Sequence, residues 1–404
     1  GIYASNVVNV TVRNCNVTMS ASSPGYGIQF NSVNNSFIIN NTANSNSFGI
    51  YLASSSNNNL TNNTASLNAY GIYLYSSSNN QIINNTANLN INYGIYLSSS
   101  SNNTVSLITA NSNNYGIYLT SSSNNNLTGN TANSNTNTGI YLTSSSNNTV
   151  SSITANSNTN TGIYLTSSSN NTLTNNNIWN CTDTTYGCLY LMGSNNNIFT
   201  GGVINLSASN LIYFRSLSAS SNNIFKDITL LGATKNDTFL TGTSINNTFL
   251  NVSYNNSVGK EYVASGSELI RKWYLDVNVT NSSGQLNNAN VSAWNVSGSL
   301  QFSTLTGSNG LITQQQLIEY VNTGSATGIN RSYYSNYTIN ASKIGYATNS
   351  TSLNLTTNTA LQFSVADVTQ VSSCGVLDQA NTVYTLTANI TTGGTCFTVS
   401  ANNI

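Results

Sequence analysis

One short motif recurs along the first half of the chain at a nearly constant spacing, and this repeat constrains the fold more than any other feature. When the sequence is aligned on Gly-Ile-Tyr, the clear copies after the first lie 22 or 23 residues apart. A period between roughly 20 and 50 residues is typical of solenoids, in which each repeat stacks on the next. The copies begin at Gly1, Gly27, Gly49, Gly71, Gly94, Gly116, Gly139 and Gly162, with looser copies at Gly187 and near Leu211.

Each repeat contains three short strand-like segments that Ser- and Asn-rich turns separate. The segments read GIYL, then NNTV or NNNL, then ITAN or NTAN. No helical period appears, and the Leu-x-x-Leu-x-Leu frame of a leucine-rich repeat is absent. Three strands per coil predict an all-β fold that begins with a parallel β-helix over residues 1–258. Roughly eleven coils, stacked about 4.8 Å apart, would form a rod about 50 Å long.

The alternation of side chains along a strand assigns an inner and an outer face to each segment. In the first segment Ile50 and Leu52 point inward, so Tyr51 points outward. In the third segment, Asn63 occupies the position that Ile108 holds in another coil. This exchange predicts internal Asn amides that hydrogen-bond from coil to coil.

The outward tyrosines are expected to form a ladder along the coils. Aromatic faces bind through area and π contacts, so the ladder is either a platform for sugars or for packing, or a stack that only stabilises the β-helix. Its members are Tyr51, Tyr73, Tyr96, Tyr118, Tyr141 and Tyr164.

The repeat pattern ends near residue 258, and three further segments follow. The charged sequence GKEYVASGSELIRKW predicts a linker over residues 259–272. Alternating apolar residues between the turns NSSGQ and GSNG predict an Ig-like β-sandwich over residues 273–366. Residues 367–404 form a separate tail that ends the sequence.

The chain is nearly free of charge, which argues against several functions. It carries nine basic and nine acidic residues and no His, so only 4% of its residues are charged. Without a basic patch, nucleic acid is not an expected partner. No apolar run reaches the roughly 18 residues of a membrane helix. Without His and with only two Met, neither a metal site nor a cofactor is expected.

Acidic and basic side chains are absent between Asn14 and Thr182, so these coils offer no general acid or base. A glycosidase needs two carboxylates within roughly 5–10 Å of each other. Asp227 and Asp237 lie ten residues apart, which is not one coil, and they are expected in a solvated patch. The chain is therefore expected not to be an enzyme. A polysaccharide lyase or hydrolase that uses these two carboxylates is the third possibility.

The five cysteines favour local disulfides in an oxidising compartment. Cys181 and Cys188 flank a short loop, and Cys374 and Cys396 flank a longer one. Without His, neither spacing is typical of a zinc site. Buried free thiols remain the alternative. Cys15 is left over, either as an inert core thiol or as an intermolecular partner.

Asn-x-Ser/Thr sequons are dense, and each is an N-glycosylation acceptor if the chain is exported. A chain this rich in Asn, Ser and Thr also produces sequons by chance. Several recur beside the same repeat position, and a subset is expected to carry glycan. The candidate acceptors are Asn9, Asn16, Asn59, Asn84, Asn102, Asn126, Asn147, Asn170, Asn246, Asn278, Asn336 and Asn389.

Two parts of the chain resemble known families. The repeat GIYLTSSSNNTV resembles the NosD-type or CASH-type right-handed β-helix repeat over about residues 1–258. The sequences DVNVTNSSGQLNNANV and YTINASKIGYAT resemble the carboxypeptidase-regulatory-like or CNA-B-like sandwich. The pair resembles surface proteins of archaea. NosD proteins are linked to copper-site assembly, but copper ligands are nearly absent from this sequence.

The tail SSCGVLDQANTVYTLTANITTGGTCFTVSANNI resembles the segment that precedes and caps the first coils in this family. Because the sequence starts within a coil, residues 367–404 would cap a neighbouring copy by strand addition, or the chain is one period of a longer tandem protein. The expected function is an N-glycosylated, non-catalytic subunit of an extracellular cell-surface filament, sheath or coat that assembles head-to-tail. A carbohydrate-binding adhesin that uses the Tyr ladder is the alternative, with surface polysaccharide as its partner.

Overall fold

The computed structural model describes residues 1–19 and 25–402. The regular secondary structure of these residues consists of β-strands, from β1 (Ile2–Ser5) to β38 (Phe397–Val399). In the described part of the chain no helix is long and apolar enough to cross a membrane. The chain divides into a first unit of residues 1–269 with 322–331, and a second unit of residues 270–321 with 332–404.

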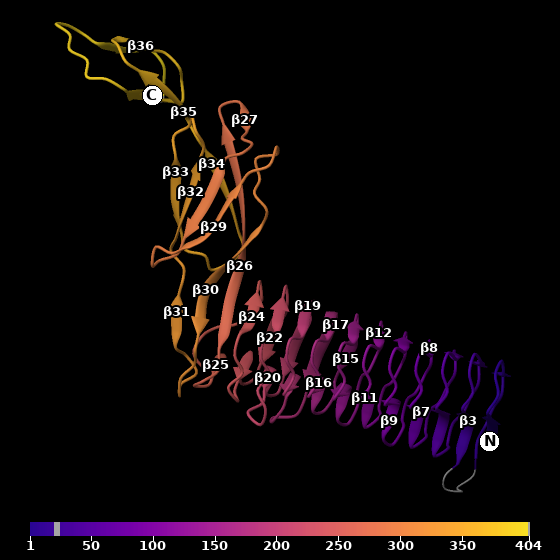
Figure 1. Cartoon of the computed structure of the whole chain (residues 1–404). Helices are drawn as coiled ribbons and strands as arrows, with labels where there is room; N and C mark the ends of the chain where they lie inside the picture. The colour runs from indigo at the N-terminus through magenta and orange to yellow at the C-terminus, as the bar shows by residue number, and fades with distance from the viewer. Residues whose placement is uncertain (20–24, 403–404) are drawn as a thin grey trace. The chain divides into compact units, whose positions relative to one another are not determined.

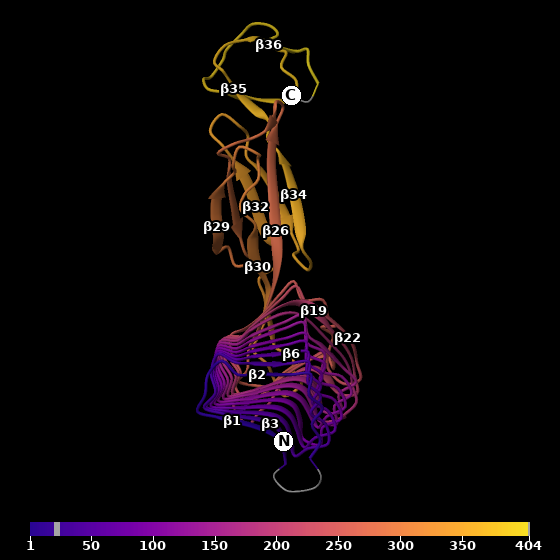
Figure 2. The same ribbon diagram turned by 90° about the vertical axis from the view of Figure 1, so that its right-hand side faces the viewer.

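The first unit is a stack of coils that each add one strand to a twelve-stranded parallel sheet (Figure 1). Equivalent residues of neighbouring coils pair in register, as Ile50 does with Ile72 and Tyr51 with Tyr73. Figure 2 views the same coils from the end of the stack, where they overlie one another. The strands of this sheet are β1, β3 (Tyr26–Asn31), β5 (Phe48–Ala53), β7 (Tyr70–Tyr75), β9 (Tyr93–Ser98), β11 (Tyr115–Thr120), β13 (Thr138–Thr143), β16 (Thr161–Thr166), β18 (Gly187–Met192), β20 (Asn210–Phe214), β23 (Thr238–Leu240) and β25 (Glu261–Val263).

Two more rows of parallel pairings complete each coil. The third segment mostly forms single bridges, such as that between Thr64 and Thr86, and becomes part of a strand in β15 (Thr154–Asn156) and β22 (Thr229–Ala233). The predicted all-β class and parallel β-helix are therefore confirmed. The second segment forms β2 (Thr11–Arg13), β4 (Phe37–Ile39), β6 (Asn59–Thr61), β8 (Gln81–Ile83), β10 (Thr104–Ser106), β12 (Asn126–Thr128), β14 (Thr149–Ser151), β17 (Thr172–Cys181), β19 (Ile198–Ser207), β21 (Ile224–Lys226) and β24 (Asn247–Leu250). Strands β17 and β19 continue into the third segment, since they pair with β15 and β22 as well.

Apolar side chains fill the interior of the coils, and Asn amides line part of it. Ile50 and Leu52 are fully buried, as the alternation predicts. Asn63 is buried as well, and its Nδ2 donates to the Ile38 carbonyl at 2.7 Å and to Asn85 Oδ1 of the next coil at 3.0 Å. Because these amides find partners in neighbouring coils, their burial leaves no polar group unsatisfied.

The turn SSSNN adds two further buried columns, one of Ser and one of Asn. The Ser100 N–H donates to Ser122 Oγ at 2.9 Å, and the Asn103 N–H donates to Asn125 Oδ1 at 2.8 Å. The residue before each of these is left-handed, with φ of 58° at Asn102, for example. The tight turn leaves backbone N–H groups without a sheet partner, and the side-chain oxygen of the next coil accepts from them.

The second unit has its own core, to which Leu275, Val291 and Ile339 belong. Strand β26 (Leu269–Asn281) buries alternate residues and pairs with β34 in parallel and with β27 antiparallel. Strands β29, β28, β32 and β33 form a separate antiparallel sheet in that order. The Ig-like sandwich stays a prediction, and residues 259–272 carry β25 and the start of β26 where a linker was expected. The remaining strands are β27 (Gly284–Gln285), β28 (Asn290–Trp294), β29 (Leu300–Leu305), β30 (Gln315–Asn322), β31 (Arg331–Tyr333), β32 (Tyr337–Ser342), β33 (Asn349–Leu353) and β34 (Thr359–Ser364).

The tail of the second unit forms two small parallel sheets. Strand β35 (Asp367–Val371) pairs with β37 (Thr382–Leu386), and β36 (Gly375–Leu377) pairs with β38. The tail therefore makes two successive turns, and each strand of the second turn pairs in parallel with the equivalent strand of the first, as in consecutive coils of the β-helix.

Candidate functional site

An aromatic surface on the twelve-stranded sheet is the most extensive candidate site. Gly71 and Ile72 are both buried, so the alternation shifts by one residue within β7. Tyr70 and Tyr73 therefore lie on the same face, with their ring centroids 5.7 Å apart. The repeat pattern did not predict this second aromatic column, although an aromatic residue precedes the Gly in five consecutive repeats. The column consists of Tyr26, Phe48, Tyr70, Tyr93 and Tyr115.

The rings stack on one another along the coils. Tyr96 and Tyr118 have centroids 5.2 Å apart and ring planes within 6°, and Tyr141 and Tyr164 stack at 4.5 Å and 6°. A sugar would need a free ring face to stack on, and here neighbouring rings cover most faces. The ladder thus has the geometry of a ring stack that stabilises the β-helix. Its use as a platform for sugars stays a prediction.

The phenol groups in this aromatic surface are poor acids. Burial raises the pKa of Tyr73, Tyr93 and Tyr141 above the ordinary value, and the neighbouring tyrosines raise it further. A phenolate would be less well solvated here and would lie close to other phenol groups. These hydroxyls remain protonated at neutral pH, so they can donate hydrogen bonds but cannot act as bases.

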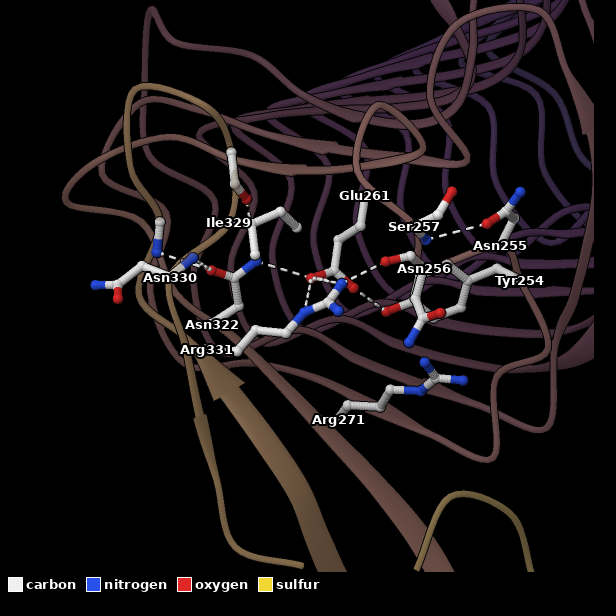
Figure 3. A network of polar contacts seen from close by, with 12 residues as sticks. Tyr254, Asn255, Asn256, Ser257, Glu261, Arg271, Asn322, Ile329, Asn330 and Arg331 are labelled. Atoms are coloured by element: carbon white, nitrogen blue, oxygen red, sulfur yellow. Dashed lines mark hydrogen bonds and ion pairs between the residues drawn. The ribbon is translucent and has the colours of Figure 1, made fainter.

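A buried carboxylate organises a polar network in the first unit (Figure 3). Glu261 is fully buried and pairs with Arg331 at 2.9 Å. Asn322 Nδ2 donates to its Oε1 at 2.7 Å, and the Tyr254 hydroxyl donates to its Oε2 at 2.5 Å. A buried charge is tolerated when it is paired and its remaining oxygens accept hydrogen bonds, as here. The network holds the segment 322–331 against the last coil.

The same segment covers the edge of β25. The Val263 N–H donates to the Gly328 carbonyl at 2.9 Å, and the Ser325 N–H donates to the Val263 carbonyl at 3.1 Å. A Cβ at Gly324 would lie 2.2 Å from the Ala264 carbonyl oxygen, so this close approach requires glycine. An open edge strand can pair with other chains. The segment 322–331 removes that possibility at β25.

The two carboxylates of the third possibility lie in different environments. Asp227 is exposed and accepts a hydrogen bond from Asn251 at 2.7 Å. Asp237 is only 4% exposed, and its Oδ2 accepts from the Asn255 N–H at 2.8 Å. The predicted solvated patch therefore fits Asp227 but is wrong for Asp237, because the loop that contains Asn255 covers it.

The tail presents apolar side chains and open strand edges. Val383 and Leu386 in β37 are 41% and 52% exposed, and Val376 and Val399 are more exposed still. Within the described residues, β37 pairs with β35 alone and β38 with β36 alone. The Cys374–Cys396 disulfide spans 22 residues, which is one coil of the β-helix.

The structure contains both disulfides that the cysteine spacing favours. Cys181 and Cys188 lie 5.5 Å apart at their Cα atoms, and Cys374 and Cys396 lie 4.6 Å apart. Cys15 is free and half-buried, and its thiol donates to the Arg13 carbonyl. Two disulfides indicate a location outside the cytoplasm.

Several candidate glycan acceptors are accessible. Asn102, Asn147, Asn170 and Asn246 are exposed at equivalent left-handed turns before the second strand of a coil. Asn59 and Asn278 are half-buried. Occupancy of the sequons stays a prediction.

Two family models match the first unit. Residues 1–132 match the right-handed β-helix region, and residues 86–210 match NosD, described as a periplasmic copper-binding protein. The resemblance to the NosD-type right-handed β-helix is therefore confirmed, whereas an archaeal source stays a prediction. No curated protein sequence matches the chain.

The copper chemistry in the NosD description does not fit the residues present here. Copper is held in proteins mainly by His, Cys and Met side chains. The sequence has no His. No group of three or more His, Cys, Asp or Glu side chains lies together among the described residues.

Solved structures with a similar fold include two enzymes of Azotobacter vinelandii. The A-module of the mannuronan C-5 epimerase AlgE6 has a TM-score of 0.52 and 15% identity, covering 62% of this chain and 74% of that one. The A-module of the mannuronan C-5 epimerase AlgE4 has a TM-score of 0.50 and 14% identity, covering 63% of this chain and 86% of that one. Both likenesses concern the fold alone.

These similarities contradict the expectation that the chain is not an enzyme, because solved proteins with this fold are epimerases. The expectation rested on the uncharged coils before Thr182. Ionisable side chains follow that stretch, among them Asp237 and Glu261. A charge-free repeat says nothing about sites outside it.

Proposed function

Because this chain is a NosD-like right-handed β-helix protein whose disulfides indicate a location outside the cytoplasm, we propose that it is a subunit of an extracellular, N-glycosylated surface filament, sheath or coat. Copies join head-to-tail. Residues 367–404 of one copy add a pair of coils to the β-helix of the next.

The construction of the tail is the observation that carries this proposal. Its strands β35 and β36 are repeated by β37 and β38 in parallel, and the disulfide joins positions one coil apart. A parallel coil normally buries its apolar residues against other coils, yet Val383 and Leu386 are exposed. Parallel strands gain stability when another strand covers their edge, and apolar side chains when a core covers them.

A second copy of the chain supplies both of these. Its β-helix is built from short strands that also pair in parallel, so pairing with the tail would extend a parallel sheet. The contact joins two different surfaces, and such heterologous contacts propagate into open fibres. Nearly uncharged coils also avoid the repulsion that stacked like charges would cause.

Sedimentation velocity over a range of concentrations tests this proposal. The unaltered chain is expected to form species of increasing mass, and the double variant Val383→Asp, Leu386→Asp is expected to stay monomeric. Val296→Asp is the control, since Val296 lies in the second unit outside the tail and is, at 59%, more exposed than Val383 or Leu386. A monomeric unaltered chain, or equal assembly by the double variant, would contradict the proposal.

A further inference from the structure

A small cavity in the first unit lies beside the buried carboxylate of Asp237. Its volume is about 240 Å³, and β22 and the loop 253–260 provide its walls. Leu231, Ala233 and Tyr254 contribute apolar surface, and Asp237 and Lys260 contribute charged groups. Pockets for drug-sized ligands begin at roughly 300 Å³, so this cavity suits one ring and not an oligomer.

Asp237 is incompletely satisfied by the protein. The Asn255 N–H is the one hydrogen-bond donor to its carboxylate in the described part of the chain. A carboxylate as buried as this one normally accepts several hydrogen bonds or forms an ion pair. Asp237 takes part in neither the Arg271–Glu319 nor the Arg331–Glu261 ion pair. One carboxylate oxygen is left to accept from a ligand in the cavity.

Lys260 lines the same cavity, and its backbone carbonyl accepts from the Asp237 N–H at 2.8 Å. Its Nζ donates to the Ala233 carbonyl at 2.6 Å, which leaves two further N–H groups of the ammonium for a ligand. Burial raises the pKa of the Asp237 carboxyl above the ordinary value, and the Asn255 N–H and the charge of Lys260 offset only part of this rise. The pair thus offers one acceptor and one donor whose charges nearly cancel.

This balance of charge selects the class of ligand. A cation attracted by Asp237 would be repelled by Lys260, and an anion attracted by Lys260 would be repelled by Asp237, so neither charge gains a net attraction. A neutral ring with adjacent hydroxyls can donate to Asp237 and accept from Lys260, while its C–H face contacts Leu231 and Tyr254. We propose that this cavity binds a single neutral monosaccharide unit, such as the end or a branch of a surface glycan.

The proposal does not depend on head-to-tail assembly, because the cavity lies within one copy. It also differs from the Tyr ladder prediction, since the stacked rings leave few free faces. The Glu261 carboxylate is not part of the proposed site, because both of its oxygens already bind Arg331, Asn322 and Tyr254.

Saturation-transfer difference NMR with glucose, galactose, mannose and N-acetylglucosamine tests this site. At least one of these sugars is expected to bind the unaltered chain. Asp237→Asn should lower the affinity for that sugar at least about tenfold, because a hydrogen bond to a charged group is lost. Asp227→Asn removes an exposed carboxylate nearby in sequence and is expected to bind as the unaltered chain does.

Glucuronate and glucosamine serve as charged counterparts of the neutral probes and are expected to bind more weakly. The melting temperature of each variant confirms that it folds. The proposal is overturned if no neutral sugar binds, if Asp237→Asn binds as tightly as the unaltered chain, or if a charged sugar binds best.

Discussion

At the scale of single residues, the buried amides explain why the repeat keeps its Asn pairs. Asn125 Oδ1 accepts from both the backbone N–H and the Nδ2 of Asn103, at 2.8 and 3.2 Å. Asn124 and Asn126 beside it are exposed. The sequence predicted an internal Asn at Asn63, because that position exchanges with Ile. It could not identify Asn125, because exposed and buried Asn residues alternate within a turn that has no apolar counterpart.

Asn125→Ala is therefore expected to destabilise the β-helix by about 1–3 kcal/mol, because it leaves the Asn103 N–H buried without an acceptor. Urea unfolding measures this change. Asn126→Ala removes an exposed amide from the next position and is expected to have little effect. Equal losses in the two variants would mean that the buried column contributes nothing specific.

The Asp237 carboxyl makes stability depend on pH. Its pKa is raised in the folded state, so the folded chain binds this proton more tightly than the unfolded chain does. At a pH below the pKa that this carboxyl has in the unfolded chain, both states are protonated and the group costs no folding stability. As the pH rises through the raised pKa, ionisation of the buried group destabilises the fold.

Asp237→Asn is accordingly expected to raise the melting temperature near neutral pH and to change it little at about pH 3. Calorimetry at the two pH values measures the difference. Asp227→Asn should show no such pH dependence. A variant that melts lower than the unaltered chain near neutral pH would contradict the assignment.

At the scale of elements, the aromatic stack and the covering segment 322–331 hold the β-helix together. The repeat predicted one column of outward tyrosines. The second column escaped prediction because strict alternation places the residue before Gly on the inner face, and the two consecutive buried residues Gly71 and Ile72 reverse this.

Tyr118→Ala is expected to lower the free energy of unfolding by about 1–3 kcal/mol, since the ring is half-buried and stacks on Tyr96 and Tyr141. Tyr118→Phe keeps the ring and should be nearly neutral. Chemical denaturation compares the two. If Phe were as destabilising as Ala, the hydroxyl and not the stack would be the stabilising group.

Arg331→Met leaves the Glu261 carboxylate buried without its cation and is expected to cost about 3–5 kcal/mol. Cleavage by a protease within residues 322–331 should become faster, because this segment loses its anchor. The double variant Glu261→Gln, Arg331→Met removes both charges and is expected to recover much of the loss. No change in cleavage for Arg331→Met would show that the backbone pairing with β25 suffices.

At the scale of the whole molecule, the repeat period predicted the β-helix because each coil must stack on an equivalent coil to bury its apolar residues. The segment 322–331 could not be predicted, because its contacts with Val263 join residues far apart in sequence that share no pattern. The exclusion of enzyme activity failed for a related reason, since the uncharged repeat was taken to represent the whole chain.

Head-to-tail assembly can be seen by negative-stain electron microscopy of the full chain beside a chain that ends at Ala366. The full chain is expected to form filaments or end-to-end oligomers, and the shortened chain separate particles, because it lacks β35 to β38. Separate particles in both samples, or filaments in both, would contradict the assignment of residues 367–404 as the segment that joins one copy to the next.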